Sequence, residues 1–391
     1  MSIADIIKSS VLINQPAFCR LPLENVHGNN FLALSSLLFA TIELRARSGT
    51  FTTPYFAPVK ENYKLFKLRF TNDNLADLYD SRALEIFNFA KSNGKNICVC
   101  WSGGIDSTSM LTSFLKNLSV NDLSIVHVIL TSSSLLENYN FYKNFISGKV
   151  KCIHYNSITL NNEFLDKNIL LHGDPGDGLF GTVVANYKNF IAGGEHLEPW
   201  KKHYKKMGAV LNKKGSMLGP KTSNFGDWFV KKISDNIEEV GESHHISTVY
   251  DWWWWAYFNF RWQSETEKLL YFMRISSKRF DPISESNLKI FREYNFYGTE
   301  KFQLWSYSNL KNMSTTQHKS YPKKYICDFT KDEIFLKNKK KVGIRGPNGK
   351  SWQHKKIRID QPYFFDKHYQ GHNEDHTIKH VLKMLLEKYK G

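Results

Sequence analysis

Residues 96–108 read NICVCWSGGIDST, a short apolar run followed by two glycines and a polar segment. The run at 96–101 is typical of a strand that is buried on both faces of a parallel sheet. Apolar residues over 105–118 recur at steps of three and four, which predicts a helix. The stretch therefore predicts a strand, a glycine-rich loop at its carboxyl end, and then a helix.

Similar units follow along the chain. Apolar runs at 125–130, 150–155 and 169–171 predict three further strands, separated by stretches with helical spacing. Before the first strand, the spacing at 75–91 predicts a helix, and the alternation at 63–69 predicts another strand. Strands that alternate with helices predict an α/β fold with a doubly wound parallel sheet, which binds ligands beyond the carboxyl ends of its strands.

The 391 residues allow two or three domains. We expect a small N-terminal α+β domain at 1–92 and a main domain at 93–391. The sheet would occupy 93–195, and the pattern over 196–391 becomes mainly helical and rich in aromatic residues. The aromatic stretch at 251–262, DWWWWAYFNFRW, is too short to span a bilayer. We interpret it as a buried helix, with a pocket wall that stacks on a ligand ring as the alternative.

Charge and cysteine content restrict the class of protein. The formal net charge of +16 favours an anionic partner such as a nucleotide, a nucleic acid or an acidic surface. Five cysteines without a CxxC pair suit neither a disulfide framework nor a structural zinc site, so we expect a cytoplasmic protein with reduced thiols. The N-terminus has no clear secretory signal, and no membrane association is expected. Histidines at four-residue steps over 368–380 are interpreted as a solvated helix face rather than a metal site.

The first glycine-rich loop predicts an anion-binding site. Its glycine pair lets backbone N–H groups approach an anion closely, and the helix that follows directs its positive end at the same place. Hydroxyl groups add donors, and Asp106 can hold Mg²⁺ beside phosphates. The residues expected to bind a nucleotide here are Ser102, Gly103, Gly104, Asp106, Ser107 and Thr108.

The sequence SGGIDST at 102–108 resembles the pyrophosphate-binding loop of the PP-loop superfamily, the N-type ATP pyrophosphatases. The resemblance implies an adenine nucleotide α-hydrolase-like fold and cleavage of ATP between its α and β phosphates, with Mg²⁺ present. Members adenylate a carboxylate, an amide or a ring oxygen, and a nucleophile then displaces AMP. Asparagine synthetase, β-lactam synthetase, argininosuccinate synthetase, NAD synthetase and several tRNA-modifying enzymes belong to the superfamily, and the loop alone does not distinguish them.

A second glycine-rich loop indicates which members of the superfamily the chain resembles. Residues 171–181, LHGDPGDGLFG, place two carboxylates three residues apart, which suits a metal-bearing turn near phosphate. They resemble the G-E-G-[SA]-D-E-x-F-G segment of asparagine and β-lactam synthetases. That resemblance implies that Asp177 binds Mg²⁺ and that Asp174 is a catalytic residue near the reacting groups. The chain departs from the segment at Gly178, which replaces an acidic residue, and at Pro175, which replaces a glycine.

Two lysines are candidates for catalysis through the same resemblance. A KYI sequence that begins at Lys324 resembles the K-Y-[IL]-L-R segment of these enzymes, and residues 339–352 can be laid on their R-x-K segment. The second match places Lys341 on the lysine that neutralises charge on the transferring phosphoryl group, a charge that a fixed ammonium can stabilise. Lys339 or Lys340 is the alternative to Lys341, and a solvated basic loop is the alternative to a catalytic segment.

The resemblance also implies where the nucleoside lies. In the superfamily the base lies against the end of the second strand, which implies that Thr131 is near adenine. Cys100, at the end of the first strand, is expected near the nucleoside, and Gly173 of the second loop completes the expected nucleotide site.

These features lead to an ATP-dependent ligase as the leading interpretation. Such an enzyme adenylates a substrate carboxylate, releases pyrophosphate and forms an amide C–N bond with ammonia or an amine. Residue 2 is not Cys and about 95 residues precede the first loop, so no complete glutaminase is expected to supply the ammonia. A PP-loop enzyme that modifies a nucleobase or nucleic acid is the alternative, favoured by the net charge and the aromatic content. A nucleotide-binding scaffold without activity is a third interpretation.

Overall fold

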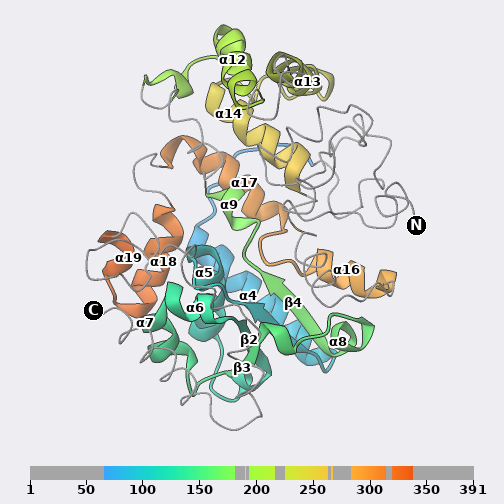
Figure 1. Ribbon diagram of the computed structural model, residues 1–391, viewed down its shortest axis with the longest axis vertical. Helices are drawn as coiled ribbons and strands as arrows, with labels where there is room; N and C mark the ends of the chain where they lie inside the picture. The colour runs from blue at the N-terminus through green and yellow to red at the C-terminus, as the bar shows by residue number, and fades with distance from the viewer. Residues whose placement is uncertain are drawn as a thin grey trace.

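The structure is a computed structural model that describes residues 66–180, 190, 193–215, 225–262, 266, 283–313 and 319–337. Four parallel strands form a sheet flanked by helices, so the chain has an α/β fold (Figure 1). The strands are β1 (Asn96–Cys100), β2 (Val126–Leu130), β3 (Lys151–His154) and β4 (Asn168–His172). The four strands expected between residues 96 and 171 are therefore confirmed.

The strand order is β3-β2-β1-β4, and every neighbouring pair is parallel. The chain passes from β1 outward through β2 to β3, and then returns to the other side of β1 to form β4. The order therefore reverses between β1 and β4. In open parallel sheets the carboxyl ends of the strands at such a reversal border a crevice, which is the usual place for a ligand.

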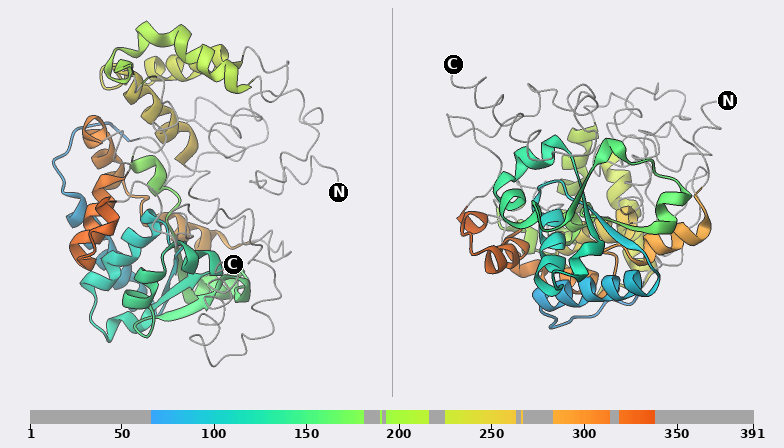
Figure 2. Two further views of the ribbon diagram at one scale, coloured as in Figure 1. Left: turned by 60° about the vertical axis from the view of Figure 1, so that its left-hand side comes forward. Right: turned by 90° about the horizontal axis from the view of Figure 1, so that it is seen from below.

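Helices cover the sheet and extend beyond the carboxyl ends of its strands (Figure 2). The α-helices are α4 (Leu75–Ser92), α5 (Ile105–Asn117), α6 (Ser132–Glu137), α7 (Tyr139–Phe141), α8 (Asn162–Lys167), α9 (Gly176–Leu179), α12 (Tyr204–Gly215), α13 (Phe225–Glu239), α14 (Val249–Trp255), α16 (Glu285–Glu293), α17 (Glu300–Asn309), α18 (Ser320–Thr330) and α19 (Ile334–Lys337). Shorter helical turns are η3 (Asp122–Ile125), η4 (Tyr142–Ile146), η5 (Tyr155–Ser157), η6 (Glu195–Leu197), η7 (Trp200–His203), η10 (Ala256–Arg261) and η11 (Leu310–Asn312). The helices expected on either side of the first strand are confirmed as α4 and α5.

Alternate residues of the strands meet different helices. Ile97 and Val99 of β1 pack with residues of α4 and α5 in one hydrophobic cluster. Cys98 and Leu170 pack in a second cluster with residues of α8 and α16. Because successive side chains of a strand point to opposite faces, helices cover both faces of the sheet. Burial on both faces explains why the strands read as almost continuous apolar runs.

The aromatic stretch forms a buried helix, as expected. Every residue over 249–259 is buried, in α14 and in the π-helical turn η10 that continues it. The indole N–H groups of Trp252 and Trp254 donate to the hydroxyls of Ser234 (3.1 Å) and Ser306 (3.0 Å). A buried indole needs such an acceptor, and these two bonds join α14 to α13 and α17.

The described part of the N-terminal segment differs from the expectation. Residues 66–69 form no strand, so the strand expected at 63–69 is wrong for the part that the structure describes. Leu68 is buried between exposed neighbours, which produces the alternation without strand pairing. α4 shares its hydrophobic cluster with the strands, so residue 92 is not a break in the core. Among the described residues, no helix combines the length and hydrophobicity needed to cross a bilayer.

Candidate functional site

The two glycine-rich loops meet at the carboxyl ends of β1 and β4, where the strand order reverses. The register pairs Cys100 with His172, so both loops leave the sheet at the same level. A Cβ added at Gly173 would lie 2.8 Å from the backbone nitrogen of Ser107. One added at Gly176 would lie 2.8 Å from the carboxyl carbon of Asp106. The second loop therefore lies directly on the first turn of α5, at a distance that only glycine permits.

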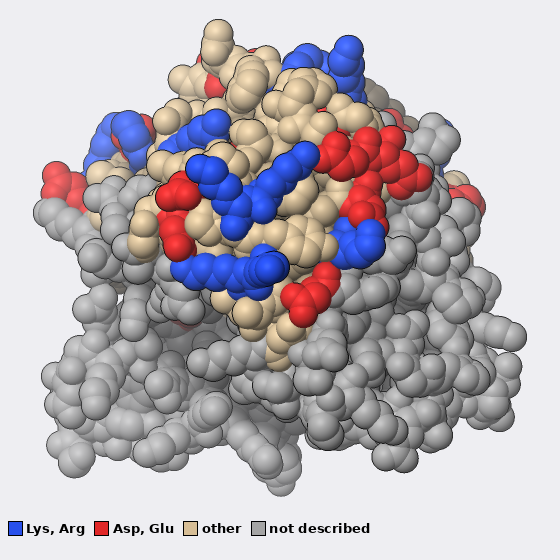
Figure 3. Space-filling model, turned by 90° about the horizontal axis from the view of Figure 1, so that it is seen from above, with Lys and Arg blue, Asp and Glu red and all other residues tan. Residues whose placement is uncertain are grey.

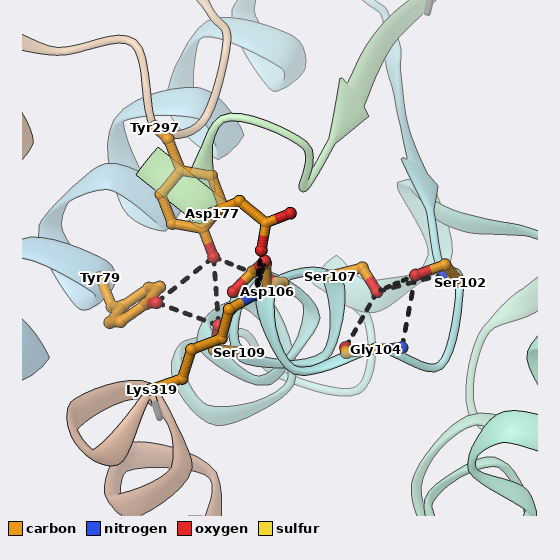
Figure 4. A network of polar contacts seen from close by, with 9 residues as sticks. All are labelled: Tyr79, Ser102, Gly104, Asp106, Ser107, Ser109, Asp177, Tyr297 and Lys319. Atoms are coloured by element: carbon orange, nitrogen blue, oxygen red, sulfur yellow. Dashed lines mark hydrogen bonds and ion pairs between the residues drawn. The ribbon is translucent and has the colours of Figure 1, made fainter. Parts of the chain in front are cut away.

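The first loop is shaped for an anion. Gly103 has a φ of +79°, and a Cβ there would lie 2.6 Å from the Ser134 carbonyl oxygen, so glycine is required on both counts. The Ser107 hydroxyl accepts from the Ser102 N–H and donates to the Gly104 carbonyl, both at 3.1 Å (Figure 4). No side chain in the described part of the chain caps the start of α5 at Gly104. The first N–H groups of this helix can therefore bind an anion supplied from outside.

Two carboxylates predicted to bind a metal come together above this loop. Asp106 lies in the first turn of α5 and Asp177 in α9, and the ammonium of Lys319 contacts both of them (Figure 4). The side chains of Lys319 and Asp106 are almost buried, whereas that of Asp177 is half-exposed. The structure confirms that the two aspartates lie close together, and it adds a lysine that the sequence pattern did not reveal.

The electrostatics of this cluster favour a further cation. Burial raises the pKa of Asp106 to about 7, with Asp177 adding to the rise and Lys319 opposing it. Burial alone would lower the pKa of Lys319, but the two carboxylates outweigh burial and raise it, so the ammonium stays charged. The Oδ1 atom of Asp106 is buried and has no hydrogen-bond partner among the described residues. Two carboxylates with one ammonium leave a negative charge and an unused ligand oxygen, which suits a hard cation.

Two buried tyrosines hold the Asp106 segment in place. The Tyr297 hydroxyl donates to the carbonyl oxygen of Asp106 (2.7 Å), and the Ser109 hydroxyl donates to the same oxygen (3.0 Å). The Tyr79 hydroxyl of α4 donates to Ser109 (3.0 Å; Figure 4). Burial raises the pKa of both tyrosines, so their hydroxyls remain donors. These residues position Asp106, and no local sequence pattern marks the two tyrosines because they lie on other elements.

Lys319 is held in an uncommon backbone conformation. Its φ of 58° and ψ of 40° lie in the left-handed region, which a lysine rarely adopts. Such a conformation costs about 1–3 kcal/mol and persists only where surrounding contacts hold it. The ion pairs with Asp106 and Asp177 are such contacts, because they fix the side chain at the start of α18.

Several expected site residues have other partners. The hydroxyl of Thr108 is buried and accepts from the indole N–H of Trp101 (3.0 Å), so it supports the loop from behind instead of facing it. Lys324 pairs with Asp328 (2.7 Å) on the exposed surface of α18, whereas Lys319 of the same segment contacts the aspartates. A lysine in an exposed i,i+4 pair has no part in the described cluster.

Cys100 and Thr131 are the residues expected near the nucleoside. Cys100 is the last residue of β1, and Thr131 directly follows β2. The Thr131 hydroxyl accepts from the Ser134 N–H (3.3 Å) and caps α6. Burial, with smaller contributions from Cys98 and Asp174, raises the pKa of the Cys100 thiol, which therefore stays neutral. Asp174 is half-exposed beside the end of β1. Lys341, Lys339 and Lys340 lie outside the described residues.

The missing acidic residue of the second loop has a steric explanation. A Cβ added at Gly178 would lie 1.6 Å from the ring of Tyr257, which is buried in the aromatic π-helical turn η10. The loop and the aromatic layer therefore pack too closely for any side chain at this position.

In comparisons with known proteins, no family model, no curated protein and no solved structure matches this chain.

Proposed function

We propose that the protein is an ATP- and Mg²⁺-dependent ligase that adenylates a substrate carboxylate, releases pyrophosphate and forms an amide bond with ammonia or an amine. The observation that carries this proposal is the meeting of a glycine-rich helix start with the Asp106–Lys319–Asp177 cluster at the carboxyl ends of β1 and β4. A site for phosphate and a site for a cation lie side by side there. The resemblance of the two loops to PP-loop enzymes, with their doubly wound sheet, supports the same function.

The phosphates of ATP would bind to the loop after β1. The uncapped N–H groups at the start of α5 and the positive end of this helix attract the triphosphate. Adenine would then lie toward Thr131, at the end of the neighbouring strand β2. The half-exposed Asp174 lies near Cys100 at the carboxyl ends of β1 and β4, where a carboxylate substrate and an amine would bind.

The residues present fit Mg²⁺. Asp106 and Asp177 would hold it, because both offer carboxylate oxygens and the buried Oδ1 of Asp106 has no partner among the described residues. When bound, the ion would neutralise charge on the phosphates. Lys319 would contribute a second positive charge beside them, which is the role that the resemblance gave to Lys341.

The reaction requires positioning and charge neutralisation from the protein. A carboxylate oxygen of the substrate attacks the α-phosphorus, the bond from this phosphorus to the bridging oxygen breaks, and pyrophosphate leaves. The amine then attacks the acyl carbon, and AMP leaves. The amine loses one proton in this step, and we assign Asp174 as the acceptor of that proton. Lys319 and the N–H groups of α5 stabilise negative charge that increases during the first step.

The alternative substrate is a nucleic acid, and the described surface gives it limited support. The face over α12 and α13 mixes basic and acidic side chains instead of forming a basic patch (Figure 3). Lys201 of η7 pairs with Glu238 of α13 (2.7 Å), and Lys231 pairs with Asp235 within α13 (2.9 Å). Residues 338–391, outside the described part, carry thirteen Lys and Arg against five Asp and Glu. Nucleic-acid binding with a steep salt dependence would favour this alternative.

The test is a screen for pyrophosphate exchange into ATP over amino acids, sugar acids and other carboxylates. The ligase predicts exchange with one class of carboxylate, and AMP and pyrophosphate as products when an amine is added. The Asp106→Asn variant should lose the exchange, and the exposed Asp235→Asn variant should retain it. Release of ADP and phosphate would contradict the proposal, and ATP binding without turnover would indicate a scaffold.

A further inference from the structure

The turn that joins α13 to α14 has a backbone fixed by four hydrogen bonds. Gly241 ends α13 with a φ of +74°, and its N–H donates to the carbonyl of Glu238 (3.1 Å). The N–H of Glu242 donates to the carbonyl of Ile237 (3.1 Å), which completes a Schellman motif. The Glu242 carbonyl then accepts from the N–H groups of His245 and of residue 246, both at 2.9 Å. Residues 242–245 are therefore held in one compact turn.

Three side chains of this turn can each offer one ligand atom to the same point. One atom each from Glu242, His244 and His245 lie within 4.8 Å of one another. The imidazole rings of His244 and His245 have centroids 4.1 Å apart. Ligand atoms that surround a tetrahedral zinc ion at about 2.0–2.1 Å are a little over 3 Å apart, so small side-chain rotations would close the set on an ion.

Glu242 provides a second, independent observation. Its side chain is buried, with 8% of the residue exposed, and its Oε2 atom has no hydrogen-bond partner among the described residues. A buried carboxylate oxygen without a partner is costly unless a cation or a donor reaches it. A cation held with the neighbouring histidines would remove this cost.

His245 is oriented as metal-binding histidines usually are. The Tyr307 hydroxyl donates to the His245 carbonyl (3.0 Å) and lies 3.2 Å from the Nδ1 atom of the same residue. Because the hydroxyl has one proton, Nδ1–H can donate to the hydroxyl oxygen, and Nε2 then keeps the lone pair. A hydrogen bond that fixes the tautomer of a ligating histidine is typical of metal sites.

From these contacts we propose that Glu242, His244 and His245 form a site for one Zn²⁺ ion, with water as its fourth ligand. Imidazole nitrogens with a carboxylate favour zinc over Mg²⁺, which prefers oxygen ligands alone. His244 is exposed, so solvent can reach the ion and complete the coordination. The site differs in ligands and in place from the Asp106 cluster, and it does not depend on the proposed ligase activity. Its ion would hold together the turn between α13 and α14, which Tyr307 of α17 contacts through His245.

The test uses the full-length protein after removal of metal with a chelator. Titration with ZnCl₂ followed by calorimetry should show one equivalent that is absent from the Glu242→Gln/His244→Asn double variant. The Tyr307→Phe variant should bind this equivalent about tenfold more weakly, because the hydroxyl that orients the His245 ring is lost. The His203→Asn variant is the control. It removes a histidine that pairs with Glu198 outside the 242–245 turn, and this variant should still bind one equivalent of zinc. Equal zinc stoichiometry in the wild-type protein and the double variant would overturn the proposal.

A second measurement needs no variant. Diethyl pyrocarbonate modifies accessible imidazoles, and peptide mass spectrometry locates the modified residues. Zn²⁺ should protect His244 from modification, and Mg²⁺ at the same concentration should leave it reactive. Modification of His244 to the same extent with and without Zn²⁺ would refute the site even if the double variant did not fold.

Discussion

Lysine–aspartate ion pairs occur both on the surface of α13 and in the Asp106–Lys319–Asp177 cluster, but in different surroundings. Lys231 and Asp235 lie 2.9 Å apart on α13, with 64% and 50% of their side chains exposed. Lys319 and Asp106 have only 11% and 12% exposed. Exposed pairs contribute about 0–1 kcal/mol, whereas removal of one partner of a buried pair costs about 3–5 kcal/mol. Burying the charges of Asp106 and Lys319 costs free energy of desolvation. Buried charge clusters of this kind are more often functional than exposed ion pairs.

The first way to test this comparison is to remove the charge of each aspartate in turn. Asp106→Asn should lower kcat for ATP-dependent turnover by at least about 10²–10³-fold, because a cation ligand and a charge partner of Lys319 are lost. Asp235→Asn should leave kcat unchanged, since its partner is exposed. Steady-state assay of AMP release measures both. Equal activity of the two variants would remove the functional distinction between the pairs.

A second test compares the lysines by stability. Lys319→Met should lower the free energy of unfolding by about 3 kcal/mol, because two carboxylates are left without their cation. Lys231→Met should lower it by less than about 1 kcal/mol. Urea denaturation measures both values. The double variant Asp106→Asn/Lys319→Met should lose less than the two single variants together, since each removes part of the same unfavourable charge. A loss for Lys319→Met as small as that for Lys231→Met would contradict the buried ion pair.

A third test compares two glycines that share a positive φ. Gly94 (φ +61°) has open space around its Cβ position, whereas a Cβ at Gly103 (φ +79°) would meet Ser134 at 2.6 Å. Gly94→Ala should cost about 1 kcal/mol from backbone strain alone. Gly103→Ala should cost about 2–4 kcal/mol, because overpacking is added to this strain. It should also weaken ATP binding, measured by calorimetry. Normal ATP affinity in Gly103→Ala would argue against phosphate binding at this loop.

A fourth test uses the pH dependence of stability in the absence of divalent cations. Burial raises the pKa of Asp106 to about 7 in the folded protein, above the unfolded value of about 3.9. The folded state therefore binds more protons between these values, and stability falls as pH rises from about 4 to 7. The slope from one group is at most about 1.4 kcal/mol per pH unit. Urea denaturation at pH 5 and pH 7 should show a smaller fall for Asp106→Asn than for the wild-type protein. An equal fall would assign the dependence to other groups.

Local patterns were enough to predict most of the sheet. Apolar runs identified β1 to β4, and the glycines after β1 and β4 identified the two loops, because strand burial and close backbone approach both depend on adjacent residues. The alternation of apolar and polar residues at 66–69 wrongly predicted a strand, because Leu68 is buried by packing and not by pairing in a sheet. The turn proposed to bind zinc has a short sequence signal, ESHH at 242–245. A glutamate close to two histidines is too common to identify a metal site from sequence, and only the burial of Glu242 in the structure distinguishes this one.

The sequence by itself predicted the α/β fold that the structure shows, together with a glycine-rich loop suited to an anion and two acidic residues suited to a cation. Only the tertiary structure decided which lysine joins them, because Lys319 is 213 residues from Asp106 and 142 from Asp177, and no periodicity marks it. The same holds for Tyr297, which holds the Asp106 carbonyl, and for Tyr257, which excludes a side chain at Gly178. Secondary structure follows from neighbours along the chain, whereas a buried charge cluster follows from which distant segments pack together.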